Sequence, residues 1–453
     1  MTEGLIMTVK KLIGLLSSAK NYPTLKGVFL GMLAADIAEL LENIDDKHTI
    51  IAFRLLSKDM AVDVFAHLSA EKQSAISKLT NEDELNIIVN ELFFDDKIDY
   101  LEEMPANIVK RILKNSTEIE RKLINQFLKY PDNSAGGLMT IELVDLNKHM
   151  TVTQALERIR SNAPDKETIY TCYCIDQYRK LEGTVSLKDL ILASPETVIE
   201  EIMKKEVLAV NTHEDQEHVA SLFKKYDLLN LPVVDREERL VGIITVDDIV
   251  DVIEKETTED FHVMAAVRGK AKKDKLLQVS IPHAIRLRLP WLIITLFGGM
   301  LAGGVIQIFE EALTAVIVLA MFIPVIMDMG GDIGIQTSTI VIRGLATGDI
   351  KRQNAMKTLF REALIGISMG IICGVVVGIA GQIWQGVPML GVAVGGAMIA
   401  TIAVASFMGA FLPIIFERLK VDPAVVSGPL ITTIKDITGL LIYFGIATLT
   451  MGI

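Results

Sequence analysis

The sequence predicts a multidomain membrane protein: an all-α N-terminal superhelical domain, an α/β tandem pair, a connector helix and a five-helix α transmembrane domain. Short segments with helical periodicity fill the first part of the chain, and a strand–turn–strand–helix unit then occurs twice. Apolar segments long enough for the ~20 residues that a bilayer core requires follow. The domains are expected at residues 1–135, 136–198, 199–255, 256–284 and 285–453.

The N-terminal domain is predicted from a degenerate repeat of short helices. Leu56-Ser57-Lys58-Asp59 and Leu68-Ser69-Ala70-Glu71 are similar phrases, and each precedes apolar residues at three- and four-residue spacing. Ser57 and Ser69 are expected as helix N-caps, because a hydroxyl can accept from the free N–H groups of the first turn. Helices too short to bury a face alone are expected to stack into a superhelix.

The middle of the chain contains a duplicated α/β unit. One copy runs from Ile169–Asp176 to Gly183–Leu190, and the other from Leu231–Asp235 to Gly242–Ile249. Each copy has a strand that ends in Asp, a strand opened by Gly, and a Ser/Thr-x-x-Asp start to a helix. The pair resembles tandem CBS domains.

The Thr245-x-x-Asp248 corner has two interpretations. As CBS modules often do, it can hold the ribose of ATP or another adenine nucleotide. Alternatively, Asp248 belongs to a set of acids on one helix, which repel one another unless a cation screens them. The simplest interpretation of those acids is a helix whose charges are solvated by water. Without the membrane segments, we would favour that interpretation.

Five membrane segments are expected after a polar connector over 254–278. Loops rich in Lys and Arg precede the first segment and separate the second from the third and the fourth from the fifth, which predicts a cytoplasmic N-terminus and an external C-terminus. The chain is therefore expected to be a multi-pass protein of the plasma membrane, the inner membrane in a bacterial cell, surrounded by lipid. The segments are expected near 289–309, 313–342, 363–384, 389–416 and 425–453.

Charge and cysteine usage exclude several classes of function. The chain has 57 Asp and Glu against 45 Lys and Arg, a net charge of −12, whereas residues 286–436 hold nine acids and ten bases. The excess acid therefore lies in the soluble part, which disfavours nucleic acid as a partner and suits a cation sensor. Cys172, Cys174 and Cys373 match no metal pattern and are expected to be reduced and structural. No nucleophile, base or phosphate-loop constellation predicts an enzyme.

The second membrane segment carries a polar stripe. Asp328, Asp332 and Gln336 recur at four-residue spacing, so they share one helix face. The Gly330-Gly331 pair is expected to weaken the helix there, and backbone freed at membrane depth survives only against protein or a water-filled path. A broken helix beside two carboxylates indicates an ion path more than a structural kink.

The fifth segment places Asp436 one turn from Thr432 in an apolar run. Gly428-Pro429 is expected to disturb that helix and leave carbonyl oxygens nearby. Carboxylate, hydroxyl and carbonyl form an all-oxygen donor set, which suits Mg²⁺ or Ca²⁺. The alternative is that Lys435 and Asp436 pair with other helices, and we favour Asp436 facing the path with Lys435 facing elsewhere.

With these motifs together, the chain resembles the MgtE family of magnesium channels over essentially its whole length. The resemblance rests on Tyr226-Asp227, Leu231–Asp235, Thr257–Asp260, Met329–Gly331, Gln336, Arg343–Ala346, Asp422–Ala424 and Thr432–Tyr443. It implies a homodimer with a pore on the two-fold axis, Asp436 at the central ion site and the Thr432 carbonyl beside it. Mg²⁺ is then both the permeant and the regulatory ion.

The resemblance also implies a cytosolic sensor in which bound Mg²⁺ closes the pore. Facing carboxylates repel without the cation and are drawn together with it. The expected ligands are Asp215, Glu217, Asp227, Asp248, Asp251, Glu256, Glu259 and Asp260.

One departure from the family leaves ion selectivity open. The family commonly has Asn where this chain has Asp332, an additional acid beside Asp328. A Mg²⁺-selective channel is the leading hypothesis. The alternatives are a divalent-cation transporter of different selectivity or proton coupling, and a membrane-anchored CBS nucleotide sensor.

Overall fold

The fold is described from a computed structural model of the chain, covering residues 3–265, 280–350, 353–423 and 428–452. The chain divides into two compact units, Met1–Val252 and Ile253–Ile453. Each unit is described by itself.

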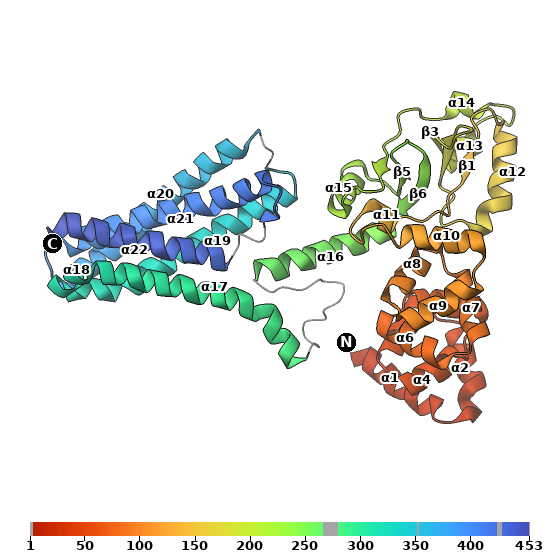
Figure 1. The fold of residues 1–453 in the computed structure, drawn as a ribbon, viewed down its shortest axis with the longest axis horizontal. Coiled ribbons are helices and arrows are strands. Elements are labelled where there is room, and N and C mark those ends of the chain that lie inside the picture. Colours follow the sequence, from red (N-terminus) through yellow and green to blue (C-terminus); the bar gives the residue numbers. More distant parts are fainter. Residues whose placement is uncertain (1–2, 266–279, 351–352, 424–427, 453) are drawn as a thin grey trace. The chain divides into compact units, whose positions relative to one another are not determined.

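The first unit begins with a stack of short helices (Figure 1). Odd-numbered helices α3, α5, α7 and α9 pack in one row and even-numbered α4, α6 and α8 in a second, which confirms the all-α superhelix. The Ser69 hydroxyl accepts from the Lys72 N–H as predicted, whereas the Ser57 side chain makes no cap hydrogen bond. The helices are α1 (Glu3–Leu16), η1 (Ala19–Asn21), α2 (Tyr22–Phe29), α3 (Ala34–Glu42), α4 (Asp46–Phe53), α5 (Lys58–Ala66), α6 (Ala70–Leu79), α7 (Glu82–Glu91), α8 (Phe94–Glu103), α9 (Ala106–Asn115) and α10 (Glu118–Phe127).

The predicted duplicated unit forms two three-stranded sheets, ordered β1-β2-β3 and β4-β5-β6. In each sheet the first pair is parallel and the second antiparallel, with Tyr173 opposite Thr184 and Val233 opposite Gly242. The first copy contains α11 (Ala135–Leu138), β1 (Asp145–Leu146), α12 (Val152–Asn162), η2 (Ala163–Asp165), β2 (Thr171–Ile175), β3 (Leu181–Ser186) and α13 (Leu187–Leu192). The second contains α14 (Ile199–Ile202), β4 (Val210–Asn211), α15 (Gln216–Tyr226), β5 (Asn230–Val234), β6 (Leu240–Thr245) and α16 (Val246–Met264).

Contacts between the sheets make the pair one body. The buried Tyr173 hydroxyl donates to Asn230 Oδ1 at 2.9 Å, and Lys180 forms an isolated bridge with Arg239. Helix α16 continues unbroken past residue 255, where a domain boundary is predicted, so the connector extends the last CBS helix. The rest of the predicted connector, residues 266–279, lies outside the described residues.

The second unit contains the five predicted membrane helices, each long and apolar enough to cross a bilayer. They run side by side in Figure 1. The first begins at Ile281, eight residues before the predicted start. The elements are α17 (Ile281–Ile308), α18 (Glu310–Ala315), η3 (Ile317–Phe322), α19 (Ile323–Ala346), α20 (Ala355–Gln385), α21 (Leu390–Arg418) and α22 (Pro429–Met451).

The predicted helix break at Gly330-Gly331 is wrong. Helix α19 runs continuously through both glycines, and the irregular stretch lies upstream in η3. The glycines serve close packing: a Cβ at Gly331 would overlap Lys435, and one at Gly334 would lie 3.3 Å from Ile431. An unbroken helix satisfies its own backbone groups, so packing explains these glycines without freed backbone at membrane depth.

Candidate ion-binding sites

The three acids predicted for the ion path lie on two membrane helices that pack together, α19 and α22. Asp328, Asp332 and Gln336 are all exposed in the single chain, on one face of α19 as their spacing predicts. The Asp436 side chain on α22 is 19% exposed, and its carboxylate lies 3.8 Å from the Lys435 ammonium. A stripe of two carboxylates and an amide is too polar to face lipid tails, so it requires water or another polypeptide.

Thr432 is placed by the start of α22. Gly428, with a φ of +66°, precedes Pro429, and the helix begins there, so the predicted interruption lies at the helix end. The Thr432 hydroxyl donates to the Gly428 carbonyl at 2.9 Å. Because the hydroxyl hydrogen is used in this bond, the lone pairs of Thr432 Oγ1 remain available to a cation.

The first unit contains a second group of carboxylates. Asp95 at the start of α8, Glu142 before β1 and Glu167 before β2 each present an oxygen, and these oxygens lie within 4.8 Å of one another. Glu142 accepts from the Phe94 N–H at 3.3 Å, so the N-terminus of α8 supports this carboxylate. One oxygen of Asp95 and one of Glu167 are buried without a hydrogen-bond partner among the described residues.

Burial and mutual repulsion raise the pKa values throughout this group. Burial is the larger cause and neighbouring carboxylates add to it. The pKa rises to about 6 for Asp95, about 7 for Asp96 and Glu142, and about 8 for Glu167 and Asp248. The fold therefore holds these carboxylates close together although they repel one another. All their possible ligand atoms are oxygens, which suits Mg²⁺ or Ca²⁺. We call Asp95, Asp96, Glu142, Glu167, Asp247 and Asp248 the acid cluster.

The structure brings only one predicted sensor residue, Asp248, into the acid cluster. Asp215 and Asp227 cap opposite ends of the 11-residue helix α15 and so lie apart, and Asp215 accepts from the Glu217 N–H at 2.9 Å. Asp260 belongs to the second unit, where burial and the Asp422 charge raise its pKa. The remaining predicted ligands, Asp251, Glu256 and Glu259, all lie on α16, and Glu259 precedes Asp260 in the sequence.

Sequence reasoning missed Asp95, Asp96, Glu142 and Glu167. They lie on three separate segments, so no spacing links them. The one available signal is the Asp95-Asp96 pair in the first turn of α8, and acids at that position ordinarily serve the helix dipole.

The corner predicted for nucleotide lies in a repulsive field. Thr245 Oγ1 donates to Asp248 Oδ2 at 3.0 Å, and the charges of Asp95, Asp96 and Asp247 act on that carboxylate. The prediction places a ribose at this corner, and phosphates brought near these carboxylates would be repelled. The Thr245–Asp248 corner therefore suits a cation better than a polyanion.

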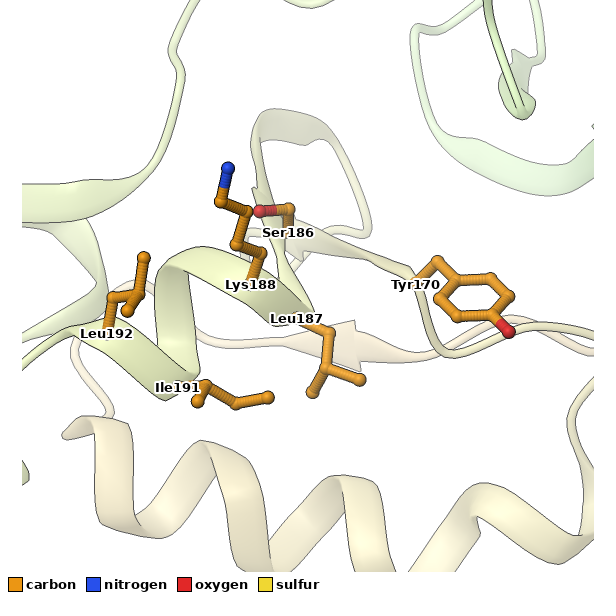
Figure 2. Close-up of a pocket in the computed structure, with 6 residues that line it drawn as sticks. All are labelled: Tyr170, Ser186, Leu187, Lys188, Ile191 and Leu192. Atoms are coloured by element: carbon orange, nitrogen blue, oxygen red, sulfur yellow. The ribbon is translucent and has the colours of Figure 1, made fainter.

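The equivalent corner of the first CBS copy has different surroundings. Ser186 Oγ donates to Asp189 Oδ2 at 2.6 Å, as Thr245 does to Asp248. An open pocket of about 460 Å³ adjoins it, and Figure 2 shows the Tyr170 ring and the Lys188 side chain along its edges. The remaining lining is Ser186, Leu187, Ile191 and Leu192. An aromatic ring and apolar side chains are groups that a nucleotide base would use, and the Lys188 ammonium points away from Leu187 and Ile191 in Figure 2.

Three protein-family models match the chain at the predicted domains. The MgtE intracellular N domain matches residues 32–133, the CBS domain matches 135–196 and 199–255, and MgtE, a divalent cation transporter family, matches 323–446. The chain is 37% identical to the magnesium transporter MgtE of Bacillus subtilis (strain 168) over 91% of both chains. It is 39% identical to the magnesium transporter MgtE of Thermus thermophilus over 92% of both chains.

A solved structure agrees for the soluble part. The soluble part of a magnesium transporter is 29% identical, with a TM-score of 0.51, and the match covers 56% of this chain and 99% of that one.

The fold and these matches define a multi-pass membrane protein with a soluble N-terminal part that contains a CBS pair. The chain belongs to the MgtE family. The predicted family and fold class are thereby confirmed.

Proposed function

We propose that this chain forms a Mg²⁺-selective channel that imports magnesium down its electrochemical gradient and is closed by cytosolic Mg²⁺. The observation that carries the proposal is the set of three carboxylates, Asp328, Asp332 and Asp436, on two packed membrane helices. Its relatives from Bacillus subtilis and Thermus thermophilus are magnesium transporters by name. Mg²⁺ dehydrates reluctantly, so the ion passes largely hydrated between oxygen ligands.

The polar stripe of α19 supports a homodimer. Asp328, Asp332 and Gln336 are uncovered in the single chain, at a depth where lipid cannot solvate them. A second copy that presents the same stripe would enclose a polar path, and two-fold pairing is the commonest symmetry of soluble homo-oligomers. The basic loops favour a plasma-membrane orientation with the N-terminus in the cytoplasm and the C-terminus outside.

Closure by Mg²⁺ is supported by the acid cluster. At high pH its carboxylates repel one another across α8, the β2 edge and α16. Mg²⁺ between them turns that repulsion into attraction and stabilises the arrangement that it bridges. The ion shifts the gate only by the difference between its affinities for the closed and open states.

Uptake into sealed liposomes tests the channel. We expect Mg²⁺ uptake without a proton gradient, loss of uptake in Asp436→Ala, and slower uptake as Mg²⁺ rises on the cytosolic side. Glu310→Ala, at the opposite end of the membrane unit from the basic loops, is the control for charge removal outside the path. Uptake that requires a proton gradient, or that favours Ca²⁺, Mn²⁺ or Co²⁺, would support a transporter of different selectivity.

Adenine nucleotide binding is a second proposed property, favoured by the pocket at Tyr170 and Lys188. We expect ATP to protect the purified chain from thermal unfolding, with the protection lost in Lys188→Ala and kept in Thr245→Ala. The reverse pattern would return the nucleotide to the Thr245–Asp248 corner. Tight nucleotide binding without any ion flux would support the anchored sensor.

A further inference from the structure

A lysine lies inside the membrane unit, among its acids. The Lys435 side chain is 8% exposed, and it lies on the face of α22 that packs against α19. The ion pair that the structure gives it is to Asp436, at 3.8 Å. The charges of Asp332 and Asp328 also act on its ammonium. An ammonium at membrane depth persists only where nearby acids compensate it.

The backbone of α19 is shaped to admit this side chain. A Cβ at Gly331 would overlap Lys435 Nζ, and one at Gly334 would lie 3.9 Å from its Cδ. The stem therefore runs along the glycine face, and the ammonium ends at Gly331, one residue from Asp332. A side chain at 331 would displace the ammonium from this position, so glycine leaves room for the lysine between the two helices.

We propose that Lys435 is an internal counter-cation that sets how strongly the ion path binds divalent cations. When all four groups are ionised, three acids and one ammonium carry two net negative charges in each chain. Asp332 and Lys435 therefore have opposite effects on the electrostatic potential at Asp436. A cation bound at Asp436 interacts with both charges. The inference rests on the proposed function, because it assumes that Asp436 faces the ion path.

The proposal predicts the direction in which each substitution changes the affinity of the path for Mg²⁺. Removing the Lys435 charge increases the negative field, so Mg²⁺ binds more tightly and saturates the path at a lower concentration. Removing the Asp332 charge has the opposite effect. Conduction needs binding that is favourable enough for entry and weak enough for release. A built-in ammonium is one way to reach that balance with several acids.

The test measures initial Mg²⁺ uptake against external Mg²⁺ in liposomes of the full chain, with a chelator inside. We expect Lys435→Met to lower the half-saturating concentration at least threefold and Asp332→Asn to raise it at least threefold. The double variant should return to within twofold of the wild type. Lys357→Met, an exposed lysine at the start of α20, is the matched control and should leave the value unchanged.

Opposite shifts distinguish this role from a structural one, in which every variant would lose uptake. If Lys435→Met fails to fold, adding it to Asp332→Asn must still lower the half-saturating concentration of that variant. Shifts in the same direction, or an unchanged value in Asp332→Asn, would overturn the proposal. Asp436→Ala is measured separately: its failure to abolish uptake would refute the proposed path, whereas the Lys435 result is read with Asp436 intact.

Discussion

Replacing Glu167 by glutamine should stabilise the metal-free protein at high pH. Glu167 is part of the acid cluster, one of its oxygens is buried without a partner among the described residues, and its pKa is raised to about 8. A carboxyl group with a raised pKa stabilises the fold fully below its unfolded pKa of 4.5, and that contribution is lost as pH rises through about 8. Glutamine keeps the shape and removes the ionisation.

The expected magnitude follows from the pKa. One pKa unit corresponds to about 1.4 kcal/mol, so raising the pKa of Glu167 from 4.5 to about 8 corresponds to at most about 5 kcal/mol at high pH. The neighbouring carboxylates share this free energy, and half of it is a reasonable expectation for one substitution. We expect Glu167→Gln to raise the free energy of unfolding by about 2 kcal/mol at pH 9, or roughly 4–8 °C in Tm.

The assay is thermal unfolding of residues 1–264, which include the first compact unit and all of α16. The soluble part of a related transporter was solved by itself, which supports this choice of segment. Unfolding is followed from pH 5 to pH 9 in a chelator and again in Mg²⁺. The wild type should gain about 2.7 kcal/mol at a Mg²⁺ concentration one hundred times Kd, and the variant should gain less.

The matched control is Glu196→Gln, an exposed glutamate of the first CBS copy outside the acid cluster. It should change neither the pH dependence nor the response to Mg²⁺. A Glu167→Gln variant that is less stable than the wild type at pH 9 in chelator would refute the reasoning, because Glu167 would then be stabilising as a carboxylate. An unchanged Mg²⁺ response would remove Glu167 from the metal ligands.

Three further substitutions test the packing and capping described above. Gly374→Ala should destabilise the membrane unit, because its Cβ would meet the backbone of α21 at 2.6 Å, whereas Gly303→Ala has open space; detergent unfolding compares them. Tyr443→Phe removes the 2.8 Å hydrogen bond that the buried Tyr443 hydroxyl donates to the Leu319 carbonyl, with a loss of about 1 kcal/mol in the same assay. Thr151→Ala should lower the unfolding free energy of residues 1–264 by about 1 kcal/mol, because it removes the capping box of α12.

Local sequence pattern predicted the parts of the fold that local physics determines. The five membrane helices follow from apolar length alone, and the duplicated CBS unit follows from the same turn and cap residues used twice. Boundaries were less accurate where a helix continues for reasons of packing, as α16 does past residue 255 and α17 does before residue 289. The glycines of α19 were misread because glycine weakens a helix and also permits close packing, and only the neighbouring side chain distinguishes these uses.

The candidate sites were predictable only in part. The face shared by Asp328, Asp332 and Gln336 follows from helix geometry, so its exposure along α19 could be expected. The acid cluster depends on how α8 packs against the CBS sheets, and that contact joins distant segments whose acids look like ordinary surface charge. Asp248 is the one predicted sensor residue that lies in the acid cluster, and its neighbours there were not predicted for this reason.

The two groups of acids differ in how their charge is balanced, and this difference matches two tasks. In the acid cluster, Lys97 and Lys166 act on Glu142, and Lys97 is paired with Glu120 at 3.1 Å. Six carboxylates face these two ammonium groups, so most of the cluster's negative charge is left for the cation of the proposed sensor. In the membrane unit, Lys435 compensates part of the charge at Asp436. A site that must release each ion needs that weaker field, so the same carboxylate chemistry can serve both sensing and passage.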